Sequence, residues 1–143
     1  MTEEMSETAK KMFEAAWTVN REIKGPTRRV LVTPAEVTRA IRESKELVKK
    51  KKYGEAEMRI RKAIDAYDQP ENSMLWEALG QVFSAWGKWE QAERSYRSAT
   101  CRIPLVSTFW SGRAQALEKL GKVKEAKAAR EIEALCIKIR GGE

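Results

Sequence analysis

The stretch from residue 73 to residue 106 reads SMLWEALGQVFSAWGKWEQAERSYRSATCRIPLV. Its apolar residues keep helical spacing on both sides of Gly87-Lys88. They are Leu75, Trp76, Leu79, Val82, Phe83 and Trp86 before this dipeptide, and Trp89, Ala92, Tyr96, Ala99 and Ile103 after it. Pro104 then ends the second run, because a proline lacks the N–H donor and disfavours helix at the residue before it. The stretch predicts two amphipathic helices joined by a tight glycine turn.

The glycine turn recurs along the chain. GKWEQA at residues 87–92 is followed 34 residues later by GKVKEA at residues 121–126, and a weaker version, KKYGEA, stands at residues 51–56. A fixed period of this length indicates stacked helix pairs, in which each pair buries its apolar face against the next. We therefore expect an all-α fold built from about three helix–turn–helix repeats.

The central copy resembles the tetratricopeptide repeat, whose pattern is W-x2-L-G-x2-Y, then A-x3-F-x2-A, then a proline. The matching residues, with aromatic exchanges at two positions, are Trp76, Leu79, Gly80, Phe83, Ala92, Tyr96, Ala99 and Pro104. The resemblance implies a right-handed α-solenoid over residues 34–140, with repeats at about 37–72, 73–106 and 107–140. It also implies that protein–protein interaction, as an adaptor or scaffold, is the function. Gly80 and Ala92 would lie where the two helices of a repeat approach most closely.

The two outer copies match the pattern less completely. The first has Ala40 in place of the tryptophan and Ser44 in place of the glycine. The third departs from the pattern, where Leu, Gly, Phe and Ala are expected, at Arg113, Ala114, Arg130 and Glu133. Arginine and glutamate late in a second helix suit a terminal repeat whose outer face meets water.

Residues 3–23 carry a further amphipathic pattern, which predicts a helix inside an N-terminal unit of residues 1–24. Ala9, Phe13 and Ala16 repeat the A-x3-F-x2-A spacing, so this helix resembles the second helix of a degenerate half-repeat. Two placements are open. The helix either continues the stack as an N-terminal cap, which we favour, or it lies in the groove of the stack.

Polar segments separate these units. Residues 25–33 form a linker, and Thr33-Pro34-Ala35-Glu36 predicts a helix start, with a capping box and a proline at the first helical position. Asp68-Gln69-Pro70-Glu71-Asn72-Ser73 ends the first copy and is expected to cap the next helix. Gly141-Gly142-Glu143 has the composition of a helix C-cap.

The composition argues against catalysis and metal binding. The chain has no histidine and two cysteines, Cys101 and Cys136, which excludes Cys/His zinc sites and most Ser–His or Cys–His nucleophiles. No Gly-rich phosphate loop is present either. We therefore expect no enzyme, no cofactor and no metal. Both cysteines fall on predicted helices, where a small buried apolar role is the main expectation and a disulfide between them the minor one.

The expected location is the cytoplasm. No apolar run approaches the roughly 18–20 residues that a membrane span needs. The first eleven residues are polar and acidic, without the apolar segment of a secretory signal. We expect no membrane partner.

The family resemblance also implies where a partner binds. In such stacks the first helices of successive repeats line a concave groove that receives an extended or helical peptide. The groove residues, carried over by position, are Arg42, Lys45, Lys49, Met74, Glu77, Ala78, Gln81, Ser111, Gln115 and Lys119. Some members clamp a C-terminal carboxylate with Lys, Asn and Arg. That clamp is missing here, because its positions hold Ile41, Lys45, Ala78, Thr108 and Gly112.

The formal net charge of +7 supports an alternative function. Nucleic acid or an acidic partner would bind the basic N-terminal half, at Arg28, Arg29, Arg42, Lys45 and Lys49–Lys52. The lysine run also suits a helix that ends near Lys51–Lys52, where cations complement the helix dipole. Self-association through exposed stack ends is a third possibility.

Overall fold

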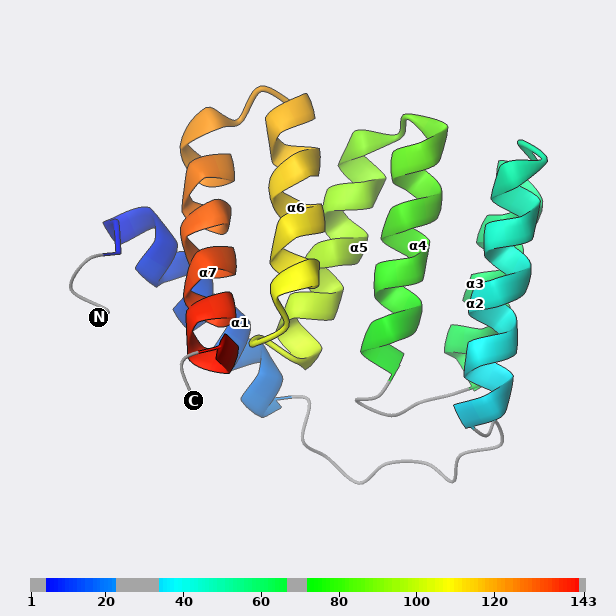
Figure 1. Ribbon diagram of the computed structural model, residues 1–143, viewed down its shortest axis with the longest axis horizontal. Helices are drawn as coiled ribbons and strands as arrows, with labels where there is room; N and C mark the ends of the chain where they lie inside the picture. Colours follow the sequence, from blue (N-terminus) through cyan, green and yellow to red (C-terminus); the bar gives the residue numbers. More distant parts are fainter. Residues whose placement is uncertain (1–4, 23–33, 67–71, 142–143) are drawn as a thin grey trace.

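The computed structural model describes residues 5–22, 34–66 and 72–141. These ranges contain helices and no strand, and the helices are α1 (Glu7–Glu22), α2 (Pro34–Lys49), α3 (Tyr53–Ala66), α4 (Ser73–Trp86), α5 (Trp89–Arg102), α6 (Ser107–Lys119) and α7 (Val123–Gly141). The helices α2 to α7 form three antiparallel pairs in a row, with α1 as an extra N-terminal helix (Figure 1). The predicted all-α solenoid of helical repeats is confirmed.

Each pair turns at a residue with positive φ. Gly87 and Gly121 have φ values of 82° and 77°, in the left-handed region that glycine adopts at little cost. In the first pair the same place is taken by Lys51, with φ of 60°, while Gly54 has moved into α3. This displacement explains why KKYGEA is the weakest match. The helix α2 ends at Lys49, close to the predicted end near Lys51–Lys52.

Two clusters of buried side chains form the core. The first contains residues of all four helices from α2 to α5, and Ala116 of α6. Its Ile60, Leu75 and Leu79 are fully buried. The second surrounds Trp110 between α6 and α7. The indole N–H of Trp110 donates to the backbone carbonyl of Pro104 at 2.7 Å, so the buried ring keeps a hydrogen-bond partner.

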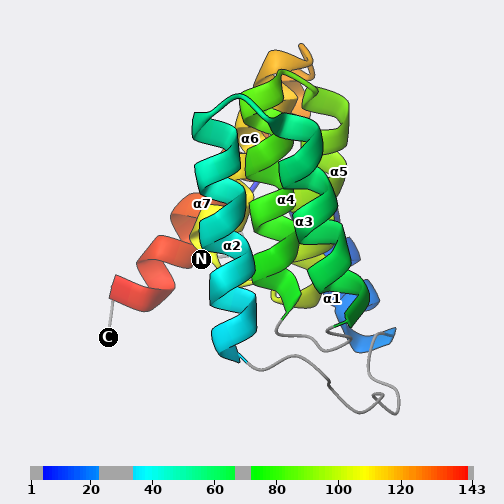
Figure 2. The same ribbon diagram turned by 90° about the vertical axis from the view of Figure 1, so that its right-hand side faces the viewer.

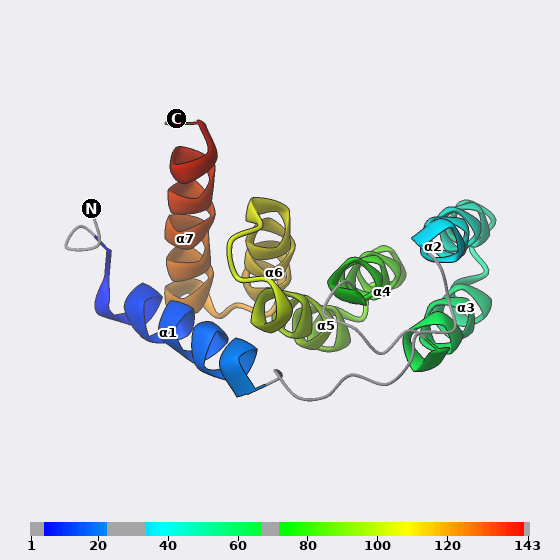
Figure 3. The same cartoon turned by 90° about the horizontal axis from the view of Figure 1, so that it is seen from below.

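The helix α1 packs against α5 and α7. Its Ala9 and Ala16 are buried in the second cluster, and the Phe13 ring lies 6.4 Å from the Trp110 ring. Figures 1 and 3 place α1 at the opposite end of the row from α2. It therefore does not extend the stack beside the first repeat, and it does not lie among α2, α4 and α6. The reason is the apolar surface of α5 and α7, which matches the apolar side of α1.

The start of α1 differs from the predicted residue 3. Ser6 precedes the helix, and its Oγ accepts a hydrogen bond from the Ala9 backbone N–H at 3.1 Å, the geometry of an N-cap. Ser6 also donates from its backbone N–H and its hydroxyl to the Glu131 carboxylate of α7, at 2.9 and 2.7 Å. The cap thus fixes the N-terminal end of α1 to the last helix.

Several predicted helix ends lie outside the described residues. These are the Thr33 cap of α2, the linker from 25 to 33, residues 67–71 and the end of the chain after Gly141. The helix α7 continues to Gly141, so the expected cap there is part of the helix. Asn72 precedes α4 as predicted, but its side chain makes no capping hydrogen bond.

Candidate functional site: the groove along the first helices

The first helices of the three pairs lie side by side along one face. α4 packs between α2 and α6, while α3 and α5 form the layer behind them (Figure 3). All ten predicted groove residues belong to α2, α4 or α6. The helix α1 lies on the side of α5, away from this face.

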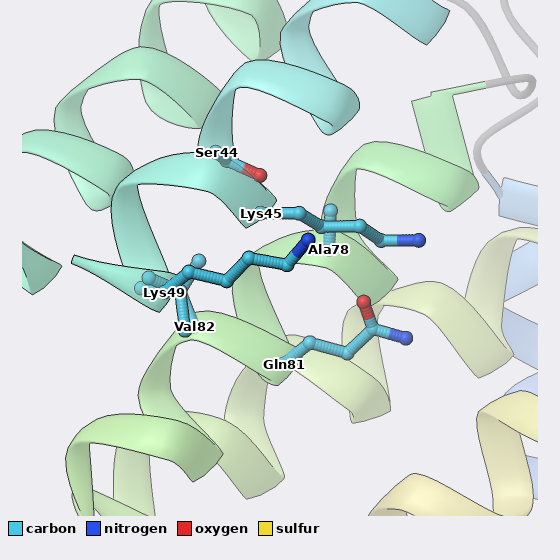
Figure 4. A pocket seen from close by; sticks show the side chains of 7 residues that line it. Ser44, Lys45, Lys49, Ala78, Gln81 and Val82 are labelled. Carbon is cyan, nitrogen blue, oxygen red and sulfur yellow. The ribbon is translucent and has the colours of Figure 1, made fainter. Parts of the chain in front are cut away.

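A pocket of about 260 Å³ opens between α2 and α4 (Figure 4). Seven residues line it, namely Ser44, Lys45, Val48, Lys49, Ala78, Gln81 and Val82. Four of the predicted groove residues thus come together: Lys45, Lys49, Ala78 and Gln81.

The floor of this pocket is apolar. Ala78 and Val82 are buried, and Val48 is half-buried beside them. Ser44 is also buried, but its hydroxyl donates to the Ile41 carbonyl of its own helix at 2.8 Å. Because its donor is already used, the hydroxyl offers the pocket no free O–H, and the rest of the floor is apolar.

The rim of the pocket is basic. Lys45, Lys49 and Gln81 are exposed, and Figure 4 shows their side chains extending alongside the mouth. Lys49 Nζ lies 3.5 Å from the Glu46 carboxylate, an exposed pair of little strength. Within the described part of the chain, Lys45 has no carboxylate within ion-pair distance. The rim can therefore meet an incoming negative charge.

Glu77 lies half-buried at the centre of the groove. Burial raises the pKa of its carboxyl, while a hydrogen bond from Thr108 of α6 and the charge of Lys45 of α2 oppose that rise. One acid thus stands between α4 and α6, opposite the lysines of α2. The groove thus carries Lys45 and Lys49 on α2, Lys119 on α6 and Glu77 on α4 between them.

The ring of Tyr96 separates α4 from α6 behind the groove. A Cβ atom on Gly80 would come within 2.9 Å of this ring, and one on Gly112 within 2.3 Å. The glycine at 80 was expected at a close approach between the two helices of its repeat. The atoms that require it are those of the tyrosine ring. Burial raises the pKa of the Tyr96 hydroxyl.

The other predicted groove residues do not line the pocket. Arg42 lines a separate pocket of about 510 Å³ with Glu43, Glu46, Leu47 and Arg59, at the α2–α3 end of the stack that faces the viewer in Figure 2. Met74 and Gln115 are exposed. Ser111 accepts a hydrogen bond from Arg130 of α7 at 3.3 Å, and Lys119 Nζ lies 5.7 Å from the Trp89 ring.

The sequence pattern did not predict a buried network of charged side chains around Glu93. Glu93 of α5 is 3% exposed and accepts hydrogen bonds from Arg113 Nε at 3.0 Å and from Arg97 Nη2 at 2.6 Å. Arg113 occupies a position where the repeat has leucine, and its guanidinium lies 5.2 Å from the Trp110 ring centre. The four-residue spacing of Glu93 and Arg97 is visible in the sequence and could have predicted their ion pair. The partner on α6 is a contact between repeats that no local spacing predicts.

Arg130 was expected to face water at the end of the stack. Its side chain is 40% exposed, and its guanidinium also bridges α7 to α6, with two hydrogen bonds of 3.1 Å to the Glu118 carboxylate. A third, also of 3.1 Å, goes to Glu133. The arginine replaces the expected phenylalanine because an ion pair can join two helices at a half-exposed site.

The cysteines and acidic residues in the described ranges form no metal site or disulfide. Cys101 and Cys136 are free thiols, and burial raises the pKa of Cys136 to about 11. In the described ranges no three His, Cys, Asp or Glu side chains cluster in a way that could hold a metal ion. The described helices also include none with the length and apolar character of a membrane span.

Comparisons with known proteins place the chain by its structure. No family model and no curated protein matches the sequence. Among solved structures, the Sgt2 TPR domain from Aspergillus fumigatus is 26% identical, with a TM-score of 0.68 over 78% of this chain and 72% of that one. The CopN-Scc3 complex contains a chain that is 12% identical, with a TM-score of 0.63 over 92% of this chain and 89% of that one. The second likeness concerns the fold alone.

Proposed function

Because the chain has a tetratricopeptide-repeat-like fold, we propose that it is a protein–protein interaction module whose groove binds a peptide or helix of a partner. The supporting observation is the pocket between α2 and α4, where an apolar floor meets a rim of lysines. A concave site with a mainly apolar lining and a few directed polar groups is the usual form of a binding site.

The placement of α1 supports the same proposal. This helix is the nearest competitor for the groove, and it packs instead against α5 and α7. Its buried Ala9 and Ala16 belong to the cluster around Trp110. In the described part of the chain, the mouth of the pocket therefore stays open to a partner.

We further propose that the module acts as an adaptor or scaffold in the cytoplasm and is not an enzyme. The sequence lacks histidine, the commonest general acid and base. The ionisable side chains among the ten groove residues are Arg42, Lys45, Lys49, Lys119 and the half-buried Glu77, an arrangement suited to recognition by charge.

A peptide selection tests the groove. A phage library of random 12-residue peptides is selected on the full chain, and the bound peptides are measured against Gln81→Trp. This substitution adds bulk at the exposed mouth of the pocket, and we expect it to weaken binding at least ten-fold. Lys62→Trp, on the exposed side of α3, is the matched control and should bind normally. Equal binding by both variants, or no selected peptide, would reject the groove.

Nucleic-acid binding is the second candidate, favoured by the lysines at the turn from α2 to α3. Lys49–Lys52 are all exposed there, whereas Arg28 and Arg29 lie outside the described residues. A labelled 20-nucleotide RNA should shift at low salt with the unmodified chain, and not when Lys50, Lys51 and Lys52 are changed to glutamine. The absence of a shift at low salt would eliminate this candidate.

A further inference from the structure

We infer that the pocket between α2 and α4 takes one apolar side chain from an internal, acidic segment of the partner. The carboxylates of that segment would lie toward Lys45 and Lys49. This inference rests on the proposed function and specifies the chemistry of the partner. It depends on the size of the pocket, its floor, its charges and the groups farther along the groove.

The size and floor of the pocket suit an apolar side chain. At about 260 Å³ it is smaller than the ~300–1,000 Å³ of sites that enclose a whole small molecule. The Ser44 hydroxyl is bonded to Ile41, and Ala78 and Val82 complete the floor. A carboxylate or carbonyl inserted there would lose water and find no free donor on the floor, which is unfavourable.

The charges around the pocket determine which peptide residues can lie beside the apolar side chain that enters it. Lys45 and Lys49 stand on the α2 side of the mouth, one helical turn apart. Glu77 stands on the α6 side, where burial already disfavours its negative charge. A second carboxylate would be repelled near Glu77 and attracted near the lysines. The acidic residues of the partner should therefore flank the anchor on the α2 side.

The groups along the groove favour carboxylates of side chains over a terminal carboxylate. Ile41 and Ala78 carry no charge, and the Thr108 hydroxyl lies beside the Glu77 carboxyl. Gly112 is backed by the Tyr96 ring, which leaves no room for a larger side chain. Lys45 and Lys49 are thus the cations beside the apolar pocket, with Lys119 farther along the groove on α6, and a lysine accepts a carboxylate anywhere along a segment.

The test uses the tightest peptide from the selection on the full chain. We expect it to carry one large apolar residue with Asp or Glu nearby. Lys45→Gln with Lys49→Gln should weaken its binding about five-fold, as expected for two exposed charge pairs. The matched control, Lys122→Gln with Lys138→Gln, removes the same charge from exposed positions outside the groove and should change binding less than two-fold.

Two further arms complete the experiment. Replacing the acidic residues of the peptide by Gln or Asn should produce the same five-fold loss, and no additional loss against the doubly substituted protein. Amidation of the peptide C-terminus should leave affinity unchanged. Anisotropy of the labelled peptide gives all these affinities, and circular dichroism verifies that the variants fold.

The outcomes separate this inference from the proposed function. If Gln81→Trp abolishes binding but neither the lysines nor the acidic residues of the peptide matter, the groove stands and the inference fails. It fails too if amidation removes the affinity, because a terminal carboxylate would then be the recognised group. If no peptide depends on Gln81, both the groove and the inference are wrong.

Discussion

The ring of Tyr96 on α5 occupies the space that a side chain on Gly112 of α6 would need. A Cβ atom added to Gly112 would lie 2.3 Å from this ring, closer than real Cβ contacts come. Gly80 of α4 faces the same ring, with a Cβ distance of 2.9 Å. One tyrosine thus sets the spacing of α4 and α6, and with it the shape of the groove between them.

Gly112→Ala should therefore destabilise the protein, although alanine is the better helix former by about 1 kcal/mol. The expected loss is about 1–3 kcal/mol of unfolding free energy, because the tyrosine ring must shift. Urea denaturation measures it. In a protein that already carries Tyr96→Leu, Gly112→Ala should cost much less unfolding free energy, because the ring that it would meet is absent.

Gly54→Ala is the matched control for that change. Gly54 lies in α3, and nothing stands within 4 Å of the Cβ it would gain. Alanine there should leave stability unchanged or raise it by up to about 1 kcal/mol. Equal effects at Gly54 and Gly112 would show that the tyrosine ring does not constrain the glycine.

Arg113→Leu should destabilise the protein, although it restores the residue typical of the repeat. Glu93 would keep Arg97 but lose the partner on α6, and a buried carboxylate would be left partly unpaired. The expected cost is about 3 kcal/mol. Urea denaturation measures it, and Glu93→Gln in combination should recover part of the loss. A stability gain from Arg113→Leu alone would show that the ion pair is not needed.

Glu77→Gln should stabilise the protein more at pH 7 than at pH 3.5. The pKa of Glu77 is raised in the folded state, so its protonated form is favoured there. The resulting stability is present below the unfolded pKa of about 4.3 and is lost as pH rises through the folded pKa. Glutamine does not ionise, so the Glu77→Gln variant does not lose this stability as the pH rises. Urea denaturation at both pH values should show the difference, with Glu55→Gln on the exposed face of α3 as the comparison.

Ala9→Glu should detach α1 from α5 and α7. Ala9 is fully buried in the cluster around Trp110, and a glutamate there would bury an unpaired charge. Limited proteolysis should then cut within α1 at least ten-fold faster than in the unmodified chain. Ala15→Glu adds the same residue at an exposed position of α1 and should not accelerate the cut. Equal cleavage of both variants would place α1 elsewhere.

The repeating helix pairs could be predicted because they depend on local spacing. Helical periodicity and the dipeptides at Gly87 and Gly121 mark the helices and turns with no knowledge of distant residues. The first turn shows the same dependence on local sequence. At Lys51 the backbone keeps the left-handed turn without a glycine, so the pattern at the first turn is weak while the turn itself persists.

The residues that converge on the pocket were only partly predictable. Arg42 and Lys45 are three positions apart on α2, and the sequence alone does not distinguish their roles. In the structure Lys45 lines the pocket toward α4, whereas Arg42 lines the pocket that includes Arg59 of α3. The direction of each side chain depends on the rotation of α2 against its neighbours, which the packing of Val37 and Ala40 in the first core cluster determines.

The sequence by itself thus determined the helices, their turns and the order of the repeats, because short-range spacing encodes them. Only the tertiary structure decided which surfaces meet. It placed α1 on α5 and α7, joined Glu93 to Arg113 across two repeats, and set Tyr96 against Gly112. An apolar helix face fits many partners in principle. The choice among them depends on shape and charge contributed by residues far apart along the chain.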